Sequence, residues 1–329
     1  MLGIRRREFI TLLGGAAAWP LAARAQQSAI PVIGWLDFES QGAARDAIPA
    51  FQRGLVETGY VVGRNVLVEY RWAEGHRDRL PELAADLVRR QATMIVAATT
   101  ASALAAKVAT QTIPVVFRIG SDPVEIGLVA SLNRPGGNIT GIANLAAEIT
   151  AKRLALLHEL VPATTSIAFL VNPANPSFAQ VETENVRSAA RVLAVHLLLL
   201  NAVTASDIAS AFATLVEQQA AALLLSADTF FFSVRDQIIS LAARYAIPSM
   251  FFDTASVAAG GLLSYGPDLL SANYQVGIYA GRILSGQRPA DLPVVQATKF
   301  ELVINLKTAK ALGLTIPPGM FAIADEIIE

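Results

Sequence analysis

Short polar segments directly follow several apolar runs of this sequence, and their side chains could bind a small solute. In the first half of the chain the candidates are Asp37, Phe38, Thr99, Thr100, Ala101, Ser121 and Asp122. In an open parallel sheet such segments lie at the carboxyl ends of the strands, where helix N-termini offer free N–H groups and a positive dipole end. The hydroxyls of Thr99 and Thr100 therefore suit a ligand carboxylate.

Helix capping is the simpler role for some of these residues. Thr100 or Ser102 could cap a helix that starts here, and capping is compatible with ligand binding. Asp122, which precedes Pro123, could cap a helix that begins at this proline. Both roles stay open at this point.

A matching set of residues occurs in the second half of the chain. Its candidates are Asn144, Asn172, Asn175, Asp228, Phe230, Asp253 and Tyr265. A ligand amino group requires a carboxylate, so Asp228 and Asp253 are the candidates for that contact, although each could serve only as an N-cap. The Tyr265 hydroxyl could contact the ligand or only hold a hinge between two lobes.

Aromatic residues accompany both sets. Phe230-Phe231-Phe232 and Phe251-Phe252 follow strands of the second half, and Trp35 and Phe38 lie in the first. Stacking on a flat ligand contributes about 0.5–1.5 kcal/mol for each good ring pair. Because most such rings are core residues, we expect only one or two of them to contact the ligand.

Sequence motifs for enzymatic chemistry are missing. There is no Gly-x-Gly-x-x-Gly after the first strand, no phosphate-binding Gly-x4-Gly-Lys-Ser/Thr and no Gly-x-Ser-x-Gly elbow. His76, His158 and His196 are far apart and lack metal-ligand spacing, and the chain has no cysteine. We therefore expect no catalytic residue, no metal and no cofactor.

The elements that must position these residues alternate along the chain. Short aliphatic and β-branched runs predict strands at 31–36, 65–70, 94–98, 114–117, 139–143, 166–171, 196–201, 221–225, 249–252, 262–265 and 300–305. Longer amphipathic segments predict helices at 44–58, 79–90, 102–110, 152–160, 178–194, 205–218, 234–245 and 272–284. The run at 94–98 is apolar without alternation, as in parallel sheets covered by helices on both faces. The pattern predicts an α/β fold built of βαβ units.

Two lobes are indicated by the glycine-rich turn at 133–138, after which 139–145 reads as a strand that crosses between them. The strand at 300–305 could run back across the same hinge. The chain is 53% apolar and 16% charged, which is enough to fill two cores.

Several segments taken together resemble one known family. They are Phe51-Gln52-Arg53-Gly54, Gly63-Arg64-Asn65, Tyr70-Arg71-Trp72-Ala73-Glu74-Gly75, Ser121-Asp122-Pro123-Val124-Glu125, Asn133-Arg134-Pro135-Gly136-Gly137-Asn138, Gly260-Gly261-Leu262-Leu263-Ser264-Tyr265-Gly266 and Asn305-Leu306-Lys307-Thr308-Ala309. With them the chain is similar to the ABC-transporter substrate-binding proteins, a family that includes tryptophan- and tyrosine-binding members.

The resemblance implies a type I periplasmic-binding-protein fold. This fold has two Rossmann-like lobes with parallel sheets, a multi-strand hinge that the chain crosses three times, and a ligand in the cleft. By the same resemblance, lobe 1 comprises residues 26–143 and about 266–298, and lobe 2 comprises 144–265 and about 299–329.

We therefore expect an extracytoplasmic solute-binding protein that closes its lobes on a small molecule and delivers it to an ABC permease in the inner membrane. The resemblance and the aromatic residues favour an amino acid with an aromatic or apolar side chain. Two alternatives stay open: an exported α/β enzyme acting in the cleft, and a ligand-sensing module of a membrane receptor. We expect a monomer.

The N-terminal segment predicts export to the periplasm. Arg6-Arg7-Glu8-Phe9-Ile10 is a twin-arginine pattern, followed by an apolar run and by the small-x-small cleavage signal Ala23-Arg24-Ala25. An apolar run of about ten residues is too short for a bilayer helix, which favours a cleaved signal peptide (residues 1–25) over an anchor. Its removal takes away four arginines and one glutamate and lowers the net charge from -1 to -4, so we expect no nucleic-acid partner.

Overall fold

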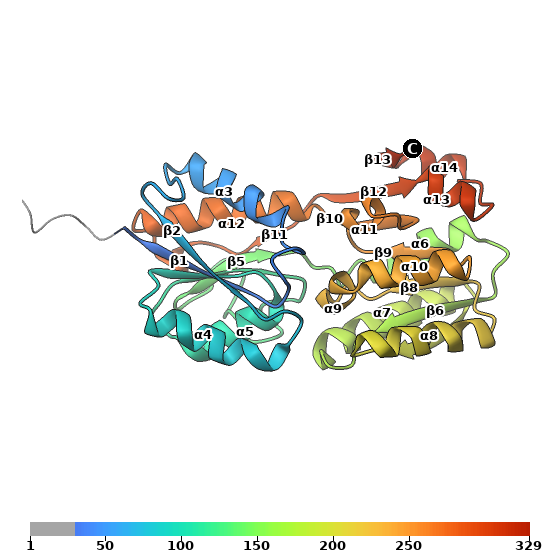
Figure 1. Ribbon diagram of the computed structural model, residues 1–329, viewed down its shortest axis with the longest axis horizontal. Helices are drawn as coiled ribbons and strands as arrows, with labels where there is room; N and C mark the ends of the chain where they lie inside the picture. Colours follow the sequence, from blue (N-terminus) through green and yellow to red (C-terminus); the bar gives the residue numbers. More distant parts are fainter. Residues whose placement is uncertain (1–29) are drawn as a thin grey trace, which may run out of the picture.

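The computed structural model describes residues 30–329, which form two α/β lobes side by side (Figure 1). The signal peptide predicted for residues 1–25 lies outside the described residues. Within 30–329, no helix combines the length and the apolar character that crossing a membrane requires.

Lobe 1 contains a six-stranded parallel sheet with the order β11-β5-β4-β3-β1-β2. Its strands are β1 Val32–Asp37, β2 Leu67–Trp72, β3 Met94–Ala97, β4 Val115–Ile119, β5 Ile139–Ala143 and β11 Val295–Gln296. Every residue of β3 and β5 is buried, because helices cover both faces of the sheet. Burial on both faces of the sheet therefore explains why these runs of the sequence are apolar without alternation.

Lobe 2 contains a seven-stranded sheet with the order β13-β12-β10-β9-β8-β6-β7. Its strands are β6 Ser166–Val171, β7 His196–Asn201, β8 Ala222–Leu225, β9 Ser249–Phe251, β10 Leu263–Pro267, β12 Phe300–Asn305 and β13 Glu326–Ile328. All neighbours are parallel except β10 and β12, which run antiparallel. The last strand, β13, ends the chain at the edge of this sheet.

Helices cover both faces of each sheet. In lobe 1 they are α3 Ala47–Glu57, α4 Leu80–Arg89, α5 Thr100–Ala109 and α12 Leu269–Leu284, with the short 3-10 turns η1 Arg77–Arg79 and η2 Pro289–Asp291. In lobe 2 they are α6 Thr150–Leu160, α7 Pro176–Val192, α8 Ala205–Glu217, α9 Thr229–Ser233, α10 Arg235–Arg244, α11 Thr254–Ala258, α13 Leu306–Ala311 and α14 Pro318–Ala322. Figure 1 shows α3 and α12 on one face of the lobe 1 sheet and α4 and α5 on the other.

The chain crosses between the lobes three times. It crosses after β5, between β10 and α12, and between β11 and β12. Two of these crossings lie side by side, because Pro267 pairs with Phe300 and the Asp268 amide donates to the Lys299 carbonyl at 3.2 Å. Several crossings, two of them adjacent, form a hinge rather than a flexible tether.

Helix α12, which follows the crossing from lobe 2, packs closely against α3 of lobe 1. This close contact requires glycine at two positions. A Cβ on Gly54 would lie 2.0 Å from the Tyr274 carbonyl oxygen, and one on Gly277 would lie 2.1 Å from the Phe51 carbonyl oxygen. Any larger side chain would push the two helix backbones apart.

Lobe 2 also contains a fully buried ion pair. Arg153 and Glu182 are 0% exposed, with 2.8 Å between Nη2 of the arginine and Oε1 of the glutamate. Nη1 of Arg153 donates to the Leu225 carbonyl at 2.7 Å, and Glu182 accepts from Thr150 Oγ1 at 2.9 Å and from the Ala227 amide at 3.0 Å. These bonds hold the end of β8, where the chain enters the segment with Asp228.

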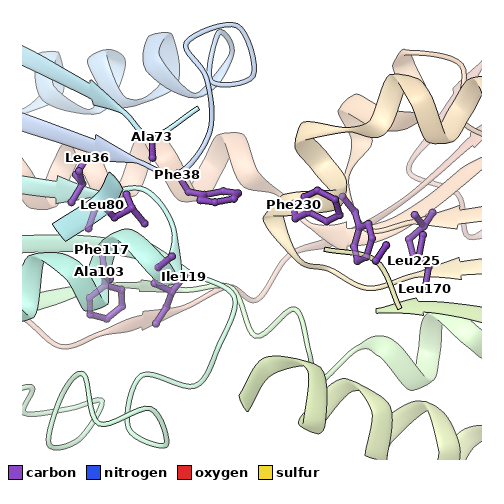
Figure 2. Packing of buried hydrophobic residues seen from close by; sticks show 14 of the residues in the cluster. Leu36, Phe38, Ala73, Leu80, Ala103, Phe117, Ile119, Leu170, Leu225 and Phe230 are labelled. Carbon is purple, nitrogen blue, oxygen red and sulfur yellow. The ribbon is translucent and has the colours of Figure 1, made fainter. Parts of the chain in front are cut away.

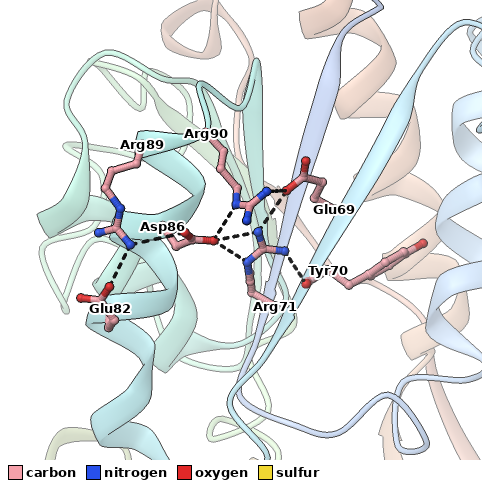
Figure 3. Close-up of polar contacts among 7 residues, drawn as sticks. All are labelled: Glu69, Tyr70, Arg71, Glu82, Asp86, Arg89 and Arg90. Carbon is pink, nitrogen blue, oxygen red and sulfur yellow. Dashed lines mark hydrogen bonds and ion pairs between the residues drawn. The ribbon is translucent and has the colours of Figure 1, made fainter.

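A second charge network lies on the surface of lobe 1, between β2 and α4 (Figure 3). Asp86 lies 2.7 Å from Arg71, and Arg89 lies 2.8 Å from Glu82. The neighbouring arginines lower the pKa of Asp86, with the Arg71 hydrogen bond as the largest cause. The Arg89–Glu82 pair is exposed, and pairs of this kind contribute little to stability because water and salt screen them.

Candidate ligand-binding site

A pocket lies where the carboxyl ends of the two sheets face each other. It has a volume of about 530 Å³, including the space open to solvent. Lobe 1 contributes the segments after β3, β4 and β5, and lobe 2 contributes those after β8 and β9 and the start of α7. Six of the residues predicted from the sequence line it: Thr99, Thr100, Ala101, Asn144, Asn175 and Asp228. We call it the cleft pocket.

The lobe 1 wall contains the first turn of α5. Thr99 is the N-cap, because its side chain accepts from the Ser102 amide at 3.2 Å. The expectation that Thr100 or Ser102 caps this helix is therefore wrong, since the helix begins at Thr100, two residues earlier than its apolar pattern suggested. Thr100 instead lies in the first turn with its hydroxyl 3.3 Å from the Ser121 hydroxyl.

Arg118 is the main feature of this wall that sequence reasoning missed. It lies near the end of β4 and lines the cleft pocket, yet it has no hydrogen bond or ion pair to any residue in 30–329, and its Nε is buried without a partner. A charged residue inside the apolar run Val115–Ile119 was the available signal. Such an arginine can bind a carboxylate with two parallel hydrogen bonds.

The side chain of Asn144 also lacks a hydrogen-bond partner in the described chain. It follows β5, is only 3% exposed and lines the cleft pocket, and its Oδ1 is buried without a hydrogen bond. An unsatisfied buried acceptor costs about 1–3 kcal/mol. A ligand that donates a hydrogen bond here would recover that cost.

The lobe 2 wall presents a positioned carboxylate. The Asn172 side-chain amide donates to Oδ1 of Asp228 at 2.8 Å, and that of Asn175 donates to Oδ2 at 2.9 Å. Asp228 also caps the short helix α9 by accepting from the Phe230 amide at 2.9 Å. Asp228 therefore both caps α9 and lines the cleft pocket. Asn172 thus acts behind the pocket wall instead of lining it.

Few aromatic rings reach the pocket. Phe178 and Phe252 line it, whereas Trp35 is buried in lobe 1 against Phe51, with 5.1 Å between their ring centroids. Phe38 and Phe230 belong to one buried cluster and face each other from the two lobes (Figure 2).

The remaining predicted residues lie elsewhere. Tyr265 lies in β10 and stacks on Phe300 at 6.1 Å, so its ring belongs to the hinge. Ser121 and Asp122 line a smaller neighbouring pocket of about 270 Å³. Asp122 accepts from the amides of Val124 and Glu125 at 2.7 and 3.2 Å, but in a turn. The helix expected from Pro123 is wrong, because 123–130 forms only turns and bends.

A second, larger cavity adjoins the cleft pocket on the hinge side. It has a volume of about 1120 Å³ including open solvent, and it shares Arg118, Thr229, Phe252 and Leu269 with the first. Asp37 and Asp253, two of the predicted ligand contacts, line this second cavity. We call it the acidic cavity.

Burial raises the pKa of three carboxyl groups at the acidic cavity, those of Asp37, Glu39 and Asp253. Loss of hydration is the largest cause in each case, because it disfavours the ionised form. For Glu39 the pKa lies well above its ordinary value, and the charges of Asp37 and Asp253 add to the effect while Arg118 and Arg235 oppose it.

No arrangement for covalent chemistry or metal binding occurs around the pockets of residues 30–329. None of the three histidines lines the cleft pocket or the acidic cavity. No group of three or more His, Asp or Glu side chains in this range could hold a metal ion. The arrangement is suited to binding a zwitterion, with a cation on one wall and a carboxylate on the other.

Two hinged α/β lobes with a polar pocket between their strand ends define a type I periplasmic binding protein. The model of the family described as ABC transporter substrate binding protein matches residues 30–328, and this chain belongs to that family. A curated relative, the tyrosine-binding protein of Clostridioides difficile, is 28% identical over 264 residues, which cover 80% of this chain and 75% of that protein.

Solved structures agree with this assignment. A conserved domain protein from Vibrio cholerae has a TM-score of 0.83 at 28% identity, over 91% of this chain and all of that one. An ABC domain from Streptococcus pneumoniae, solved in complex with L-Trp, has a TM-score of 0.79 at 27% identity, over 90% of this chain and all of that one. The fold and the family predicted from the sequence are thereby confirmed.

Proposed function

We propose that this protein binds an amino acid with an aromatic or apolar side chain in the cleft pocket and delivers it to an ABC permease. One observation carries the proposal: an unpaired arginine on the lobe 1 wall faces a pocket whose lobe 2 wall presents the oriented Asp228 carboxylate. The tyrosine-binding relative and the L-Trp complex support the ligand class.

Each end of such a ligand has a partner. Arg118 and the first turn of α5 bind the α-carboxylate, while Asp228 and the Asn144 Oδ1 bind the α-amino group. Phe178 and Phe252 provide apolar contact for the side chain. Because the groups come from both lobes, the ligand interacts fully only with the closed state and shifts the population towards it.

We further propose where the protein acts and that it leaves its ligand unchanged. The protein acts in the periplasm after twin-arginine export and cleavage near Ala25, as a monomer without cofactor. It returns its ligand chemically unchanged, in keeping with a family of binding proteins. Micromolar affinity corresponds to about -8 kcal/mol, which a few charge-assisted hydrogen bonds and apolar contacts can provide after ordering costs.

Calorimetric titration of the mature protein with single amino acids tests the proposal. Phenylalanine, tyrosine or tryptophan should bind, and Asp228→Asn should weaken that binding by about 10- to 100-fold, since a hydrogen bond to a charged group is worth about 1.5–3 kcal/mol. Asp78→Asn, on the exposed part of η1, is the matched control and should bind like the wild type. Absence of binding by every amino acid would refute the proposal.

A further inference from the structure

The acidic cavity is not used by the function proposed above. It opens into the cleft pocket through the four shared residues and has about twice the volume of that pocket. Its walls combine apolar side chains, such as Phe232 and Leu270, with seven carboxylates. These are Asp37, Glu39, Asp46, Asp253, Asp268, Glu301 and Glu326. Among residues 30–329, Arg118 is the only cationic residue that lines it.

Most of these carboxylates already have partners. Asp268 and Glu301 both pair with Lys299, at 3.4 and 2.5 Å. Asp253 caps α11 and accepts from the Ser256 amide and hydroxyl at 2.8 and 2.7 Å. Such groups have their hydrogen bonds satisfied within the protein and do not by themselves indicate a ligand.

Glu39 differs from the others. It is only 7% exposed and lines the cavity, but its carboxylate has no hydrogen bond or ion pair to any residue of the described chain. The charged groups around it are Asp37, Asp253, Arg118 and Arg235, and neither arginine lies within 4.0 Å of it as an ion pair. An unpaired buried carboxylate is unfavourable, so a bound cation would stabilise the ionised form of Glu39.

An organic cation suits this site better than a metal ion. Metal binding requires several oxygen ligands at close range, and no such group exists within 30–329. The apolar walls favour a charge carried on a hydrocarbon chain. We propose that the acidic cavity binds the terminal ammonium group of an aliphatic amine, with Glu39 as the main contact and Asp253 facing it from lobe 2.

Two sources could supply this ammonium group: the distal end of a basic amino acid whose α-carboxylate lies in the cleft pocket, or a separate diamine. The inference goes beyond the proposed function, because the second source does not require any amino acid in the cleft pocket. Loss of a proton from Glu39 should accompany binding from either source, since loss of hydration raises the pKa of this carboxyl group.

Calorimetry with the mature chain separates these cases. Lysine is compared with norleucine, which has the same carbon chain without the ammonium group, and putrescine is titrated alone and in the presence of phenylalanine. We expect lysine to bind about 10-fold or more tightly than norleucine, or putrescine to bind with phenylalanine present, because a charge-assisted bond is gained. Tighter binding of lysine identifies the side-chain ammonium group of a basic amino acid as the group bound in the acidic cavity. Binding of putrescine together with phenylalanine identifies a separate diamine.

Glu39→Gln is the decisive variant. It should abolish the preference for the amine and the buffer-dependent proton release, while phenylalanine affinity stays within about 2-fold. Glu217→Gln, at the exposed end of α8, is the matched control. Thermal unfolding of both variants verifies that they are folded.

The inference is overturned if amino acids bind but neither lysine nor putrescine shows an advantage that depends on Glu39. Failure of the proposed function looks different, because no amino acid would then bind at all. An amine that still binds through Glu39 in that case would support the inference on its own.

Discussion

Two sets of buried or half-buried charged side chains in this protein differ in how fully they are hydrogen-bonded. In lobe 2, Arg153 and Glu182 contact each other and the surrounding backbone and hydroxyl groups. At the cleft pocket and the acidic cavity, the side chains of Arg118 and Glu39 have no hydrogen bond or ion pair to any residue of 30–329. The first set holds the fold together, and the second has the unsatisfied capacity that a ligand can fill.

This difference shows how structural and functional charges can be distinguished within one chain. Burial alone does not separate them, since Glu182 and Glu39 both have a raised pKa because of lost hydration. The distinction lies in the partners, because a buried charge is tolerated only when it is paired or hydrogen-bonded. Four measurements test this contrast.

The largest effect should come from breaking the lobe 2 pair. Arg153→Met leaves Glu182 buried without its cation and should lower the free energy of unfolding by about 3–5 kcal/mol, measured by chemical denaturation. The double variant with Glu182→Leu should recover much of that loss, because no buried charge is left alone. A single variant as stable as the wild type would contradict the structural role of this pair.

At the cleft, removal of a charge should affect binding more than stability. Arg118→Gln should weaken amino-acid binding by about 10- to 100-fold, since a charge-assisted bond to the carboxylate is lost. Its unfolding midpoint should stay close to that of the wild type, because the Arg118 side chain has no hydrogen bond or ion pair within 30–329 to lose. The exposed Arg64→Gln is the control, and equal affinity of the two variants would exclude Arg118 from the site.

Glu39→Gln should change how stability depends on pH. A carboxyl group whose pKa is raised in the folded state contributes stability that is complete below its ordinary value of 4.5 and is lost as the pH rises through the folded pKa. The variant should therefore match the wild type at low pH and become more stable than it at neutral pH. Unfolding curves across this pH range test the sign, and a variant less stable at neutral pH would contradict it.

The surface network around Arg71 and Asp86 should show the smallest effect. Arg89→Gln removes an exposed ion pair with Glu82. Its change in unfolding midpoint should be much smaller than that of Arg153→Met and should vanish in high salt. A large effect that persists in salt would show that the network shown in Figure 3 is more than a solvated surface cluster.

The sequence predicted the elements and several binding residues. The strands at 139–143, 166–171 and 196–201 occur with those bounds, because apolar periodicity and turn residues are local signals. Thr99, Asn144 and Asp228 could be selected because each follows a strand, where a parallel sheet exposes its helix N-termini. The helix expected from Pro123 failed because a favourable cap and proline do not suffice without tertiary contacts that support a helix.

The sequence by itself therefore determined an α/β chain with polar groups at its strand ends, since these features depend on neighbouring residues. Only the tertiary structure decided which polar groups share a pocket. It separated Asp37 and Asp253 from Asp228, and it revealed Arg118 and Glu39 as charges without partners among the described residues. The physical reason is that pairing and burial depend on how two lobes meet, and residues distant in the chain set that arrangement.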